Sequence, residues 1–443
     1  MASDSSFRGE LRALVRLAVP LAAAQAGTNL MGLVDVAVLG RSGARQLAAA
    51  GLGNAIFFAV SVIGMGLVFG IDPLISQALG AGDRVRARRA FWQGIWLALC
   101  VSVILTIVAV LAAYAFPAAG VQHDLIAESQ QFLLIRAISL APFLMFLVAR
   151  AYLQAHGRTT PMLVAMITAN IFNFLLDLWF VFGWGPVPAM GVGGAALSTV
   201  VCSFLQLAIV SVAVRRMRID GVDHRWHAGE VWTAFKVGLP VGLQLGAEIG
   251  VFALVGVLAA RLGTLQLASH QLVLSLASFT YTLALGVAAA GSVRVGRAVG
   301  ANDAIATRRA GMAAFIGGIV IMSLNAAAFG FAPQPLARLV TNQQSVIAAA
   351  LPLFVVAAFF QLSDGIQAVG AGVLRGAGDT KFAFYANLLG HWFIGLPIAL
   401  LLGFHLQMGI VGLWWGLCAG LTVVAALLFY RFERLSSRAI APL

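Results

Sequence analysis

Five carboxylates lie inside long apolar stretches of this sequence, where an ionised side chain is expensive. Each such charge costs roughly 2.5–3.5 kcal/mol at the centre of a membrane helix. It persists only with a partner, with water, with a cation or in its protonated form. Proton or Na⁺ carriage needs groups of this kind. The five residues are Asp35, Asp72, Asp177, Glu248 and Asp364.

The first group joins Asp35 to a polar stripe in the apolar stretch 160–182. Asn170, Asn173 and Asp177 are spaced i, i+3 and i+7, so they share one helix face. Their amide and carboxylate oxygens suit a hard cation. We predict a shared cation site, with Na⁺ at Asp35, Asn173 and Asp177 as the only metal ion. The residues predicted to line a substrate cavity beside it are Gln25, Thr28 and Met31.

A second group falls in the later half of the chain. Gln244 and Glu248 share one face of the stretch 237–260, and Asp364 lies on a second polar face in the stretch 346–373. An aromatic ring beside a carboxylate suits a lipophilic cation through ring-face attraction and ion pairing. The alternative for both groups is structural, namely hydrogen bonding between helices. The other residues predicted to line the cavity here are Phe360, Gln361 and Gln367.

Asp72 and Arg294 form a candidate gate. Both are expected near the cytosolic ends of their spans, and they carry opposite charges. We predict that they pair when the cytosolic side is shut. The alternative is that each is solvated independently at the level of the lipid headgroups.

The composition indicates a membrane protein. Of 443 residues, 61% are apolar and 10% are charged, whereas soluble domains carry about 25% charged residues. The net charge of +12 arises in short loops between apolar stretches, so nucleic-acid binding is not expected. No Ser-His-Asp set, HExxH motif or Cys-His cluster is present in the sequence. We therefore expect neither an enzyme nor a cofactor.

Hydropathy predicts twelve membrane spans of roughly 20 residues or more. Placing both termini in the cytosol puts all but five of the 28 Lys and Arg residues on the cytosolic side, as positive residues favour that side. The predicted spans are 11–39, 47–74, 91–116, 132–153, 160–182, 190–214, 237–260, 267–293, 310–331, 346–373, 382–404 and 408–430.

The chain repeats itself at a nearly constant offset. Residues 266–268 repeat 46–48 (both QLA), and 296–303 (GRAVGAND) resemble 76–83 (SQALGAGD), each 220 positions later. We predict an all-α fold with two six-helix bundles, residues 1–220 and 221–443. Six spans per half is an even number, so the pseudo-twofold axis runs along the membrane normal.

Four segments together resemble the multidrug and toxic compound extrusion (MATE) exporters. They are residues 33–40 (LVDVAVLG), 169–177 (ANIFNFLLD), 293–296 (VRVG) and 371–379 (AGVLRGAGD). The resemblance implies antiport of cationic drugs against Na⁺ or H⁺. It assigns Asp35, Asn173 and Asp177 to an N-terminal cation site, as in DinF-like members. It assigns Glu248 and Asp364 to a C-terminal acidic pair, as in NorM-like members, so the branch stays open.

The sequence therefore predicts a cation-coupled exporter of organic cations that works by alternating access. We expect a monomer in the bacterial inner membrane. Two alternatives remain at this stage: a lipid-linked oligosaccharide flippase of the same superfamily, and a passive channel. Neither the substrate nor the choice between Na⁺ and H⁺ follows from the sequence.

Overall fold

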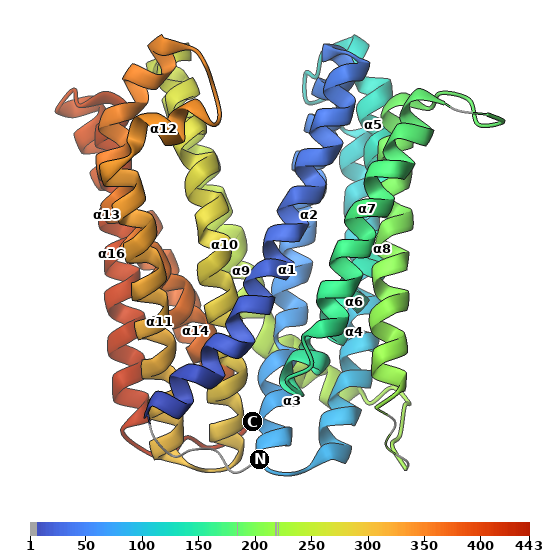
Figure 1. Cartoon of the computed structure of the whole chain (residues 1–443), viewed down its shortest axis with the longest axis vertical. Coiled ribbons are helices and arrows are strands. Elements are labelled where there is room, and N and C mark those ends of the chain that lie inside the picture. Colours follow the sequence, from blue (N-terminus) through green and yellow to red (C-terminus); the bar gives the residue numbers. More distant parts are fainter. Residues whose placement is uncertain (1–6, 184, 218, 220) are drawn as a thin grey trace. The chain divides into compact units, whose positions relative to one another are not determined.

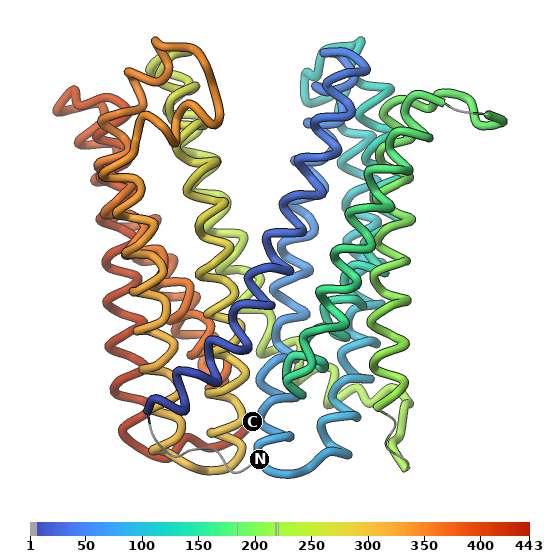
Figure 2. Tube along the Cα trace, viewed as in Figure 1, coloured from blue at the N-terminus to red at the C-terminus, as the bar shows by residue number. Residues whose placement is uncertain are grey.

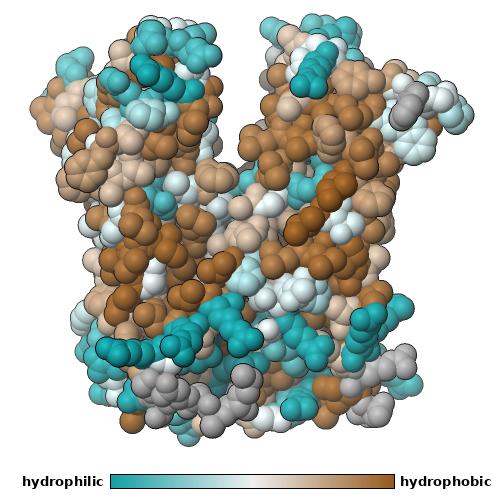
Figure 3. Space-filling view, viewed as in Figure 1, coloured by the Kyte–Doolittle hydropathy of each residue, from teal (hydrophilic) through white to brown (hydrophobic). Residues whose placement is uncertain are grey.

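The computed structural model describes residues 7–183, 185–217, 219 and 221–443, and these form long helices joined by short turns (Figure 1). Among the described residues, eleven helices are long and apolar enough to cross a membrane, and the bent pair α5–α6 supplies a twelfth span. The protein is therefore an all-α, multi-pass membrane protein, as predicted. On the face in Figure 3, apolar residues cover the middle of each unit and hydrophilic residues gather at its ends.

Two compact units divide the chain, and two long helices belong partly to each. Unit 1 contains the described residues up to Gln25, Ser76–Gly82 and Leu243–Leu443, and unit 2 contains Ala26–Ile75 and Asp83–Gly242. The divided helices are α1 (Phe7–Ser42) and α9 (Ala228–Leu262). Each carries an internal proline, Pro20 in α1 and Pro240 in α9, shortly before the boundary. The predicted bundles were residues 1–220 and 221–443, whereas unit 1 also contains the first part of α1 and unit 2 also contains the first part of α9.

The remaining helices fill one unit each, except for the short α3 (Ile71–Gly80), which spans a boundary. Figure 2 shows that α1 begins at the end of unit 1 where α16 ends. Unit 2 contains α2 (Ala44–Phe69), α4 (Arg84–Tyr114), α5 (His123–Ala137), α6 (Leu140–Ala155), α7 (Thr160–Phe182) and α8 (Gly191–Arg215). Unit 1 contains α10 (Thr264–Gly300), α11 (Ala304–Phe331), α12 (Pro333–Arg338), α13 (Gln344–Ala377), α14 (Thr380–Leu388), η1 (Leu389–Gly395), α15 (Leu396–Leu400), η2 (Leu401–His405) and α16 (Gly409–Ser436).

Close helix crossings repeat at the same 220-residue offset as the sequence. In unit 2, a Cβ on Gly66 of α2 would lie 2.2 Å from the Cα of Gly242 in α9. In unit 1, a Cβ on Gly286 of α10 would lie 2.6 Å from the Cβ of Ala22 in α1. Gly286 and Gly242 correspond to Gly66 and Ala22, respectively. Small residues let membrane helices approach closely, so each unit contains the same crossing built from the two halves of the sequence.

The repeated sequence GAGD/GAND forms matching helix starts. The side chain of Asp83 accepts a hydrogen bond from the backbone N–H of Arg86 at 2.8 Å, and Asp303 accepts one from Ala306 at the same distance. Both aspartates are therefore N-caps, of α4 and α11. The residue before each cap has a left-handed backbone, with φ of +79° at Gly82 and 55° at Asn302, a conformation that Gly and Asn adopt most readily.

Two predicted spans are less regular than the sequence suggested. The fourth is broken into α5 and α6, which meet at 41°, because Pro142 lacks the N–H that would bond to the carbonyl of Ile138. The predicted span 382–404 contains the π-helical segments η1 and η2. Pro397 removes another helical hydrogen bond between these segments, and π-helical turns are often found at functional sites.

Candidate functional site

The two aspartates predicted to share a site in the first half do so, inside unit 2. Asp35 projects from the unit 2 part of α1, and Asp177 from α7. Their carboxyl groups are within hydrogen-bonding distance of each other. Asp177 is fully buried. Two carboxyl groups in such contact require a shared proton or a cation, because two bare anions would repel each other.

Polar side chains on α7 and α8 hold this pair. Asn173 donates its amide N–H to Asp35 Oδ1 at 3.0 Å, and the Thr199 hydroxyl donates to Asp35 Oδ2 at 3.2 Å. The Ser198 hydroxyl donates to Asp177 Oδ1. Two buried oxygens, Asp177 Oδ2 and Asn173 Oδ1, have no hydrogen-bond partner. Carboxylate, amide and hydroxyl oxygens together form a ligand set that suits a hard cation.

Arg136 supplies a positive charge that the sequence did not assign to the site. Its side chain lies on α5, attracts the Asp35 carboxylate and stacks over Phe57, with the guanidinium carbon 4.2 Å from the ring centroid. Arg136 falls inside the predicted span 132–153, but the sequence analysis counted it only among the positive charges of the outer side. With both aspartates ionised, one guanidinium beside them leaves one negative charge uncompensated.

The other residues predicted around this site serve different contacts. Asn170 donates its amide to the backbone carbonyls of Gly27 at 3.0 Å and Met166 at 2.9 Å, so it ties α7 to α1 rather than binding either aspartate. Met31 is buried against Ala169 and Cys202. The exposed Thr28 lies with its hydroxyl 3.9 Å from the Met166 sulfur, and Gln25 is half-buried.

A second acidic group lies inside unit 1. Glu248 on α9 accepts hydrogen bonds at Oε2 from Gln367 at 3.1 Å and from Asn387 at 3.2 Å. Asp364, on the same helix as Gln367, is close enough to repel Glu248 electrostatically. Tyr281 on α10 lies near both acids. The predicted partners Glu248, Asp364 and Gln367 therefore come together, with Asn387 as an addition.

Three other residues predicted to line the cavity lie in the packed interior of unit 1. Gln361 donates to the Thr280 hydroxyl at 2.7 Å. Phe360 is 3% exposed and makes an edge contact with Trp414, their ring centroids 5.6 Å apart. Gln244 is buried as well. Phe360 thus belongs to the hydrophobic core, where its ring packs against other rings.

Arg294, one of the two predicted gate residues, pairs with Glu10 inside unit 1. Its Nε and Nη2 atoms both donate to the carboxylate of Glu10, which lies in the first turn of α1 within unit 1. Asp72 lies in the first turn of α3, where a negative charge is favoured by the helix dipole. The sequence analysis missed Glu10 because it belongs to the polar tail before the first span.

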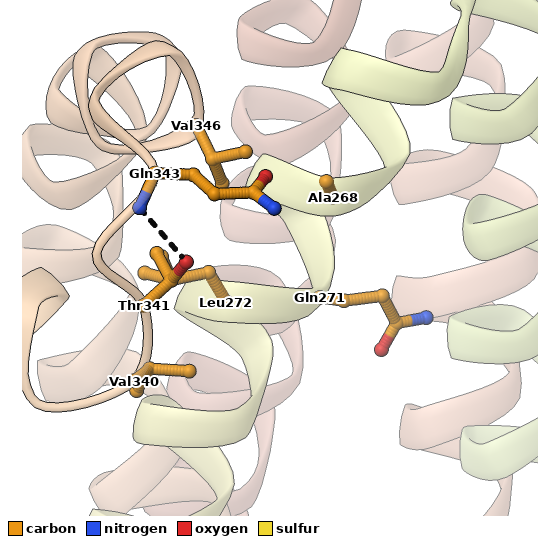
Figure 4. A pocket seen from close by; sticks show the side chains of 7 residues that line it. All are labelled: Ala268, Gln271, Leu272, Val340, Thr341, Gln343 and Val346. Atoms are coloured by element: carbon orange, nitrogen blue, oxygen red, sulfur yellow. Dashed lines mark hydrogen bonds between the residues drawn. The ribbon is translucent and has the colours of Figure 1, made fainter. Parts of the chain in front are cut away.

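Two pockets of the described chain are lined by other residues than those of the acidic groups. A pocket of about 270 Å³ lies beside α10 and the turn before α13, where the Gln343 N–H donates to the Thr341 hydroxyl at 3.2 Å (Figure 4). A second, of about 580 Å³, lies between α4 and the start of α9. Neither is lined by a residue of the predicted sites.

Comparison with known proteins gives one consistent result. The MatE family model matches residues 20–179 and 240–401. A probable multidrug resistance protein NorM from Rhizobium meliloti (strain 1021) is 33% identical over 452 residues, covering 99% of this chain and 96% of the relative. A protein of the same name from Deinococcus radiodurans is 34% identical over 436 residues, covering 96% of each.

Solved structures share the fold at lower identity. The crystal structure of the eukaryotic MATE transporter AtDTX14 superposes with a TM-score of 0.87 at 20% identity, covering 98% of both chains. A transporter of the MOP superfamily from Pyrococcus furiosus gives a TM-score of 0.88 at 20% identity, covering 97% of this chain and 96% of that one.

Proposed function

Because the chain belongs to the MatE family, we propose that it is a multidrug transporter that exports organic cations in exchange for Na⁺ or H⁺. As a member of a transporter family it is a transport protein and not an enzyme. The coupling ion, the antiport mechanism and the roles of individual residues are the parts that require experiment.

The observation that carries this proposal is the contact between the carboxyl groups of Asp35 and Asp177. Arg136 offsets one of their two charges, so a single monovalent cation makes the site neutral. We therefore expect one coupling ion to bind there in each cycle. Asn173 and Thr199 orient Asp35 through hydrogen bonds, and the Asn173 carbonyl oxygen is available as a further ligand.

The second acidic group suits the organic cation. Glu248 and Asp364 lie close enough to repel each other electrostatically, whereas in the first pair Arg136 attracts Asp35. A cationic substrate would satisfy the negative charge that these two acids share in their ionised form. Gln367 and Asn387 hold Glu248 through hydrogen bonds, and we assign them to positioning.

The transport cycle couples the two events. An ion entering from outside neutralises its site and weakens the hold on the organic cation, and the organic cation favours ion release inside. Each ligand shifts the equilibrium only through its different affinity for the two states. The membrane potential contributes about 2.3 kcal/mol per charge per 100 mV to cation entry. We propose that Asp72 and Arg294 form the cytosolic gate. In the structure the partner of Arg294 is Glu10.

The orientation follows from the basic loops. We infer that both termini are cytosolic and that the protein resides in the bacterial inner membrane as a monomer. We further infer that residues 1–220 and 221–443 arose by duplication.

Purified protein in liposomes tests the proposal. A lipophilic cationic dye is loaded inside, and either a Na⁺ gradient or a pH gradient is imposed alone. Accelerated efflux under one of the two gradients is the expected result. Efflux that responds to neither gradient, with no acceleration by dye on the opposite side, would indicate a passive channel. Transport of a lipid-linked pyrophosphate in place of the dye would indicate a flippase.

A further inference from the structure

The apolar groove between α4 and the start of α9 has no role in the proposed transport chemistry. Its cavity of about 580 Å³ is within the ~300–1,000 Å³ typical of small-molecule sites. The groove lies wholly in unit 2. The lining residues that matter here are Leu97, Cys100, Ile104, Trp226, Gly229 and Trp232.

The groove opens to the surface that faces lipid. Ile104 is 61% exposed and Trp232 is 54% exposed, and both lie on helices that cross the membrane. Trp226 and Trp232 lie just before and within the first turns of α9, at the depth where tryptophan is enriched between hydrocarbon and headgroups. An occupant of the groove therefore enters from the bilayer.

Hydrogen bonds from α4 fix the wall that Trp226 forms. Gln93 donates its amide to the carbonyl of Arg225 at 2.8 Å and accepts from the backbone N–H of His227 at 3.0 Å. These two contacts bracket Trp226 on both sides along the chain. Its ring also makes an edge contact with Trp96, with centroids 6.4 Å apart. These contacts hold Trp226 in place as one wall of the groove.

A cation lies at the edge of this groove. Lys236 extends from the third turn of α9, and its ammonium lies 5.4 Å from the centroid of the Trp232 ring. Among the described residues Lys236 has this cation–π contact and no ion pair with an acid. Glu230, the acid in the first turn of α9, pairs instead with Arg89 at 3.6 Å. A lysine near the end of a membrane helix extends its ammonium toward the headgroup level, where it attracts anionic lipid.

We propose that this groove binds one anionic phospholipid, with an acyl chain against Leu97 and Ile104 and the phosphate beside Lys236. The apolar lining fits the chain, and the ammonium supplies the complementary charge for the headgroup. The loop end of the groove is also the basic side of the protein, with Arg225 in the connection before α9. Lysine and arginine at this level attract the anionic lipids of the cytoplasmic leaflet.

Native mass spectrometry of the full-length protein tests the proposal. The protein is released from nanodiscs that contain equal amounts of phosphatidylglycerol and phosphatidylcholine. We expect one retained phosphatidylglycerol, favoured over phosphatidylcholine about tenfold. Lys236→Gln should reduce that preference to about twofold or less, and the matched variant Lys381→Gln, an exposed lysine in unit 1, should preserve it.

A second variant tests the groove itself. A Cβ on Gly229 would meet no atom within 4 Å, so Gly229→Phe can fill the groove without disturbing the backbone. We expect it to remove the retained lipid. Equal retention of both lipids by the unmodified protein, or retention unaffected by Lys236→Gln and Gly229→Phe, would show an ordinary lipid boundary and overturn the proposal.

Fluorescence supplies an independent readout that does not require release from the bilayer. Brominated acyl chains quench nearby tryptophan, and Trp232→Phe identifies the part of the signal that comes from the groove. Quenching of that part should saturate at a lower fraction of brominated phosphatidylglycerol than of brominated phosphatidylcholine. Linear quenching with the same slope for both lipids would contradict a specific site.

Discussion

The ion pair between Glu10 and Arg294 allows a quantitative prediction. Both nitrogens Nε and Nη2 of Arg294 donate to the two oxygens of one carboxylate, and the side chains are 26% and 15% exposed for Arg294 and Glu10. Exposed pairs contribute about 0–1 kcal/mol, and hydrogen bonds to charged groups about 1.5–3 kcal/mol. Partial exposure places this pair between the two, at about 1–2 kcal/mol of coupling.

A double-mutant cycle measures that coupling. The variants are Glu10→Gln, Arg294→Gln and the combination, and the quantity is the free energy of unfolding in detergent, followed by tryptophan fluorescence. Glu10 also stabilises the first turn of α1 through the helix dipole. The double-mutant cycle cancels this separate contribution and leaves only the energy of interaction with Arg294. We expect the double variant to be more stable than additivity predicts by about 1–2 kcal/mol.

A parallel cycle tests the alternative partner. Asp72→Asn combined with Arg294→Gln should be additive within about 0.5 kcal/mol, because Glu10 already engages two of the three guanidinium nitrogens. Additivity in the Glu10 cycle together with coupling in the Asp72 cycle would refute the assignment of Glu10 as the partner.

Two further predictions follow from local contacts. Gly66→Ala should lower the unfolding free energy by about 1–3 kcal/mol, because the new Cβ meets the backbone of α9. The control Gly51→Ala, on the same helix, places its Cβ where no atom lies within 4 Å and should raise the unfolding free energy by about 0.5–1 kcal/mol. Equal effects at both sites would contradict the close crossing of α2 and α9. Asn173→Ala removes a hydrogen bond to Asp35 and should weaken coupling-ion affinity about tenfold, because such a bond contributes about 1.5 kcal/mol. Asn170→Ala should change the ion affinity less than twofold. A larger effect of Asn170→Ala than of Asn173→Ala on ion-dependent transport would show that the two amides have been assigned the wrong roles.

Periodicity and hydropathy predicted the helices and most of the acidic partners. An apolar helix with few polar residues leaves little choice about which side chains face inward, so Asp35 and Asp177 could be grouped from spacing, whereas the pairing of Glu248 with Asp364 came from the family resemblance. The 220-residue offset also predicted matching elements, as the caps at Asp83 and Asp303 confirm.

The partners that the sequence did not predict share a physical reason. Ser198 and Thr199 also bond to the carbonyl of Ala195 in their own helix, which is the ordinary role of hydroxyls in membrane helices, so their second contacts depend on packing. Arg136 and Glu10 lie near the ends of spans, where hydropathy cannot separate a loop residue from a residue that turns inward.

The same limit applies to the cavity prediction. A face of a helix can be assigned from spacing, but whether it lines open space or packs against another helix depends on the neighbouring helix. Phe360 shows this difference, because it contacts Trp414 in the core of unit 1. Asn387 was missed for the same reason: it lies in the regular helix α14, and its spacing does not show that it contacts Glu248 of α9.

The most direct test of the coupling site compares two modes of transport by Asp35→Asn in liposomes. Uphill movement of a cationic dye driven by the coupling-ion gradient requires an ion at the Asp35–Asp177 pair, whereas dye-for-dye exchange does not. We predict that Asp35→Asn abolishes gradient-driven movement and retains exchange, with the amount of folded protein unchanged. Normal gradient-driven movement by this variant would contradict the assignment of the coupling ion to this pair.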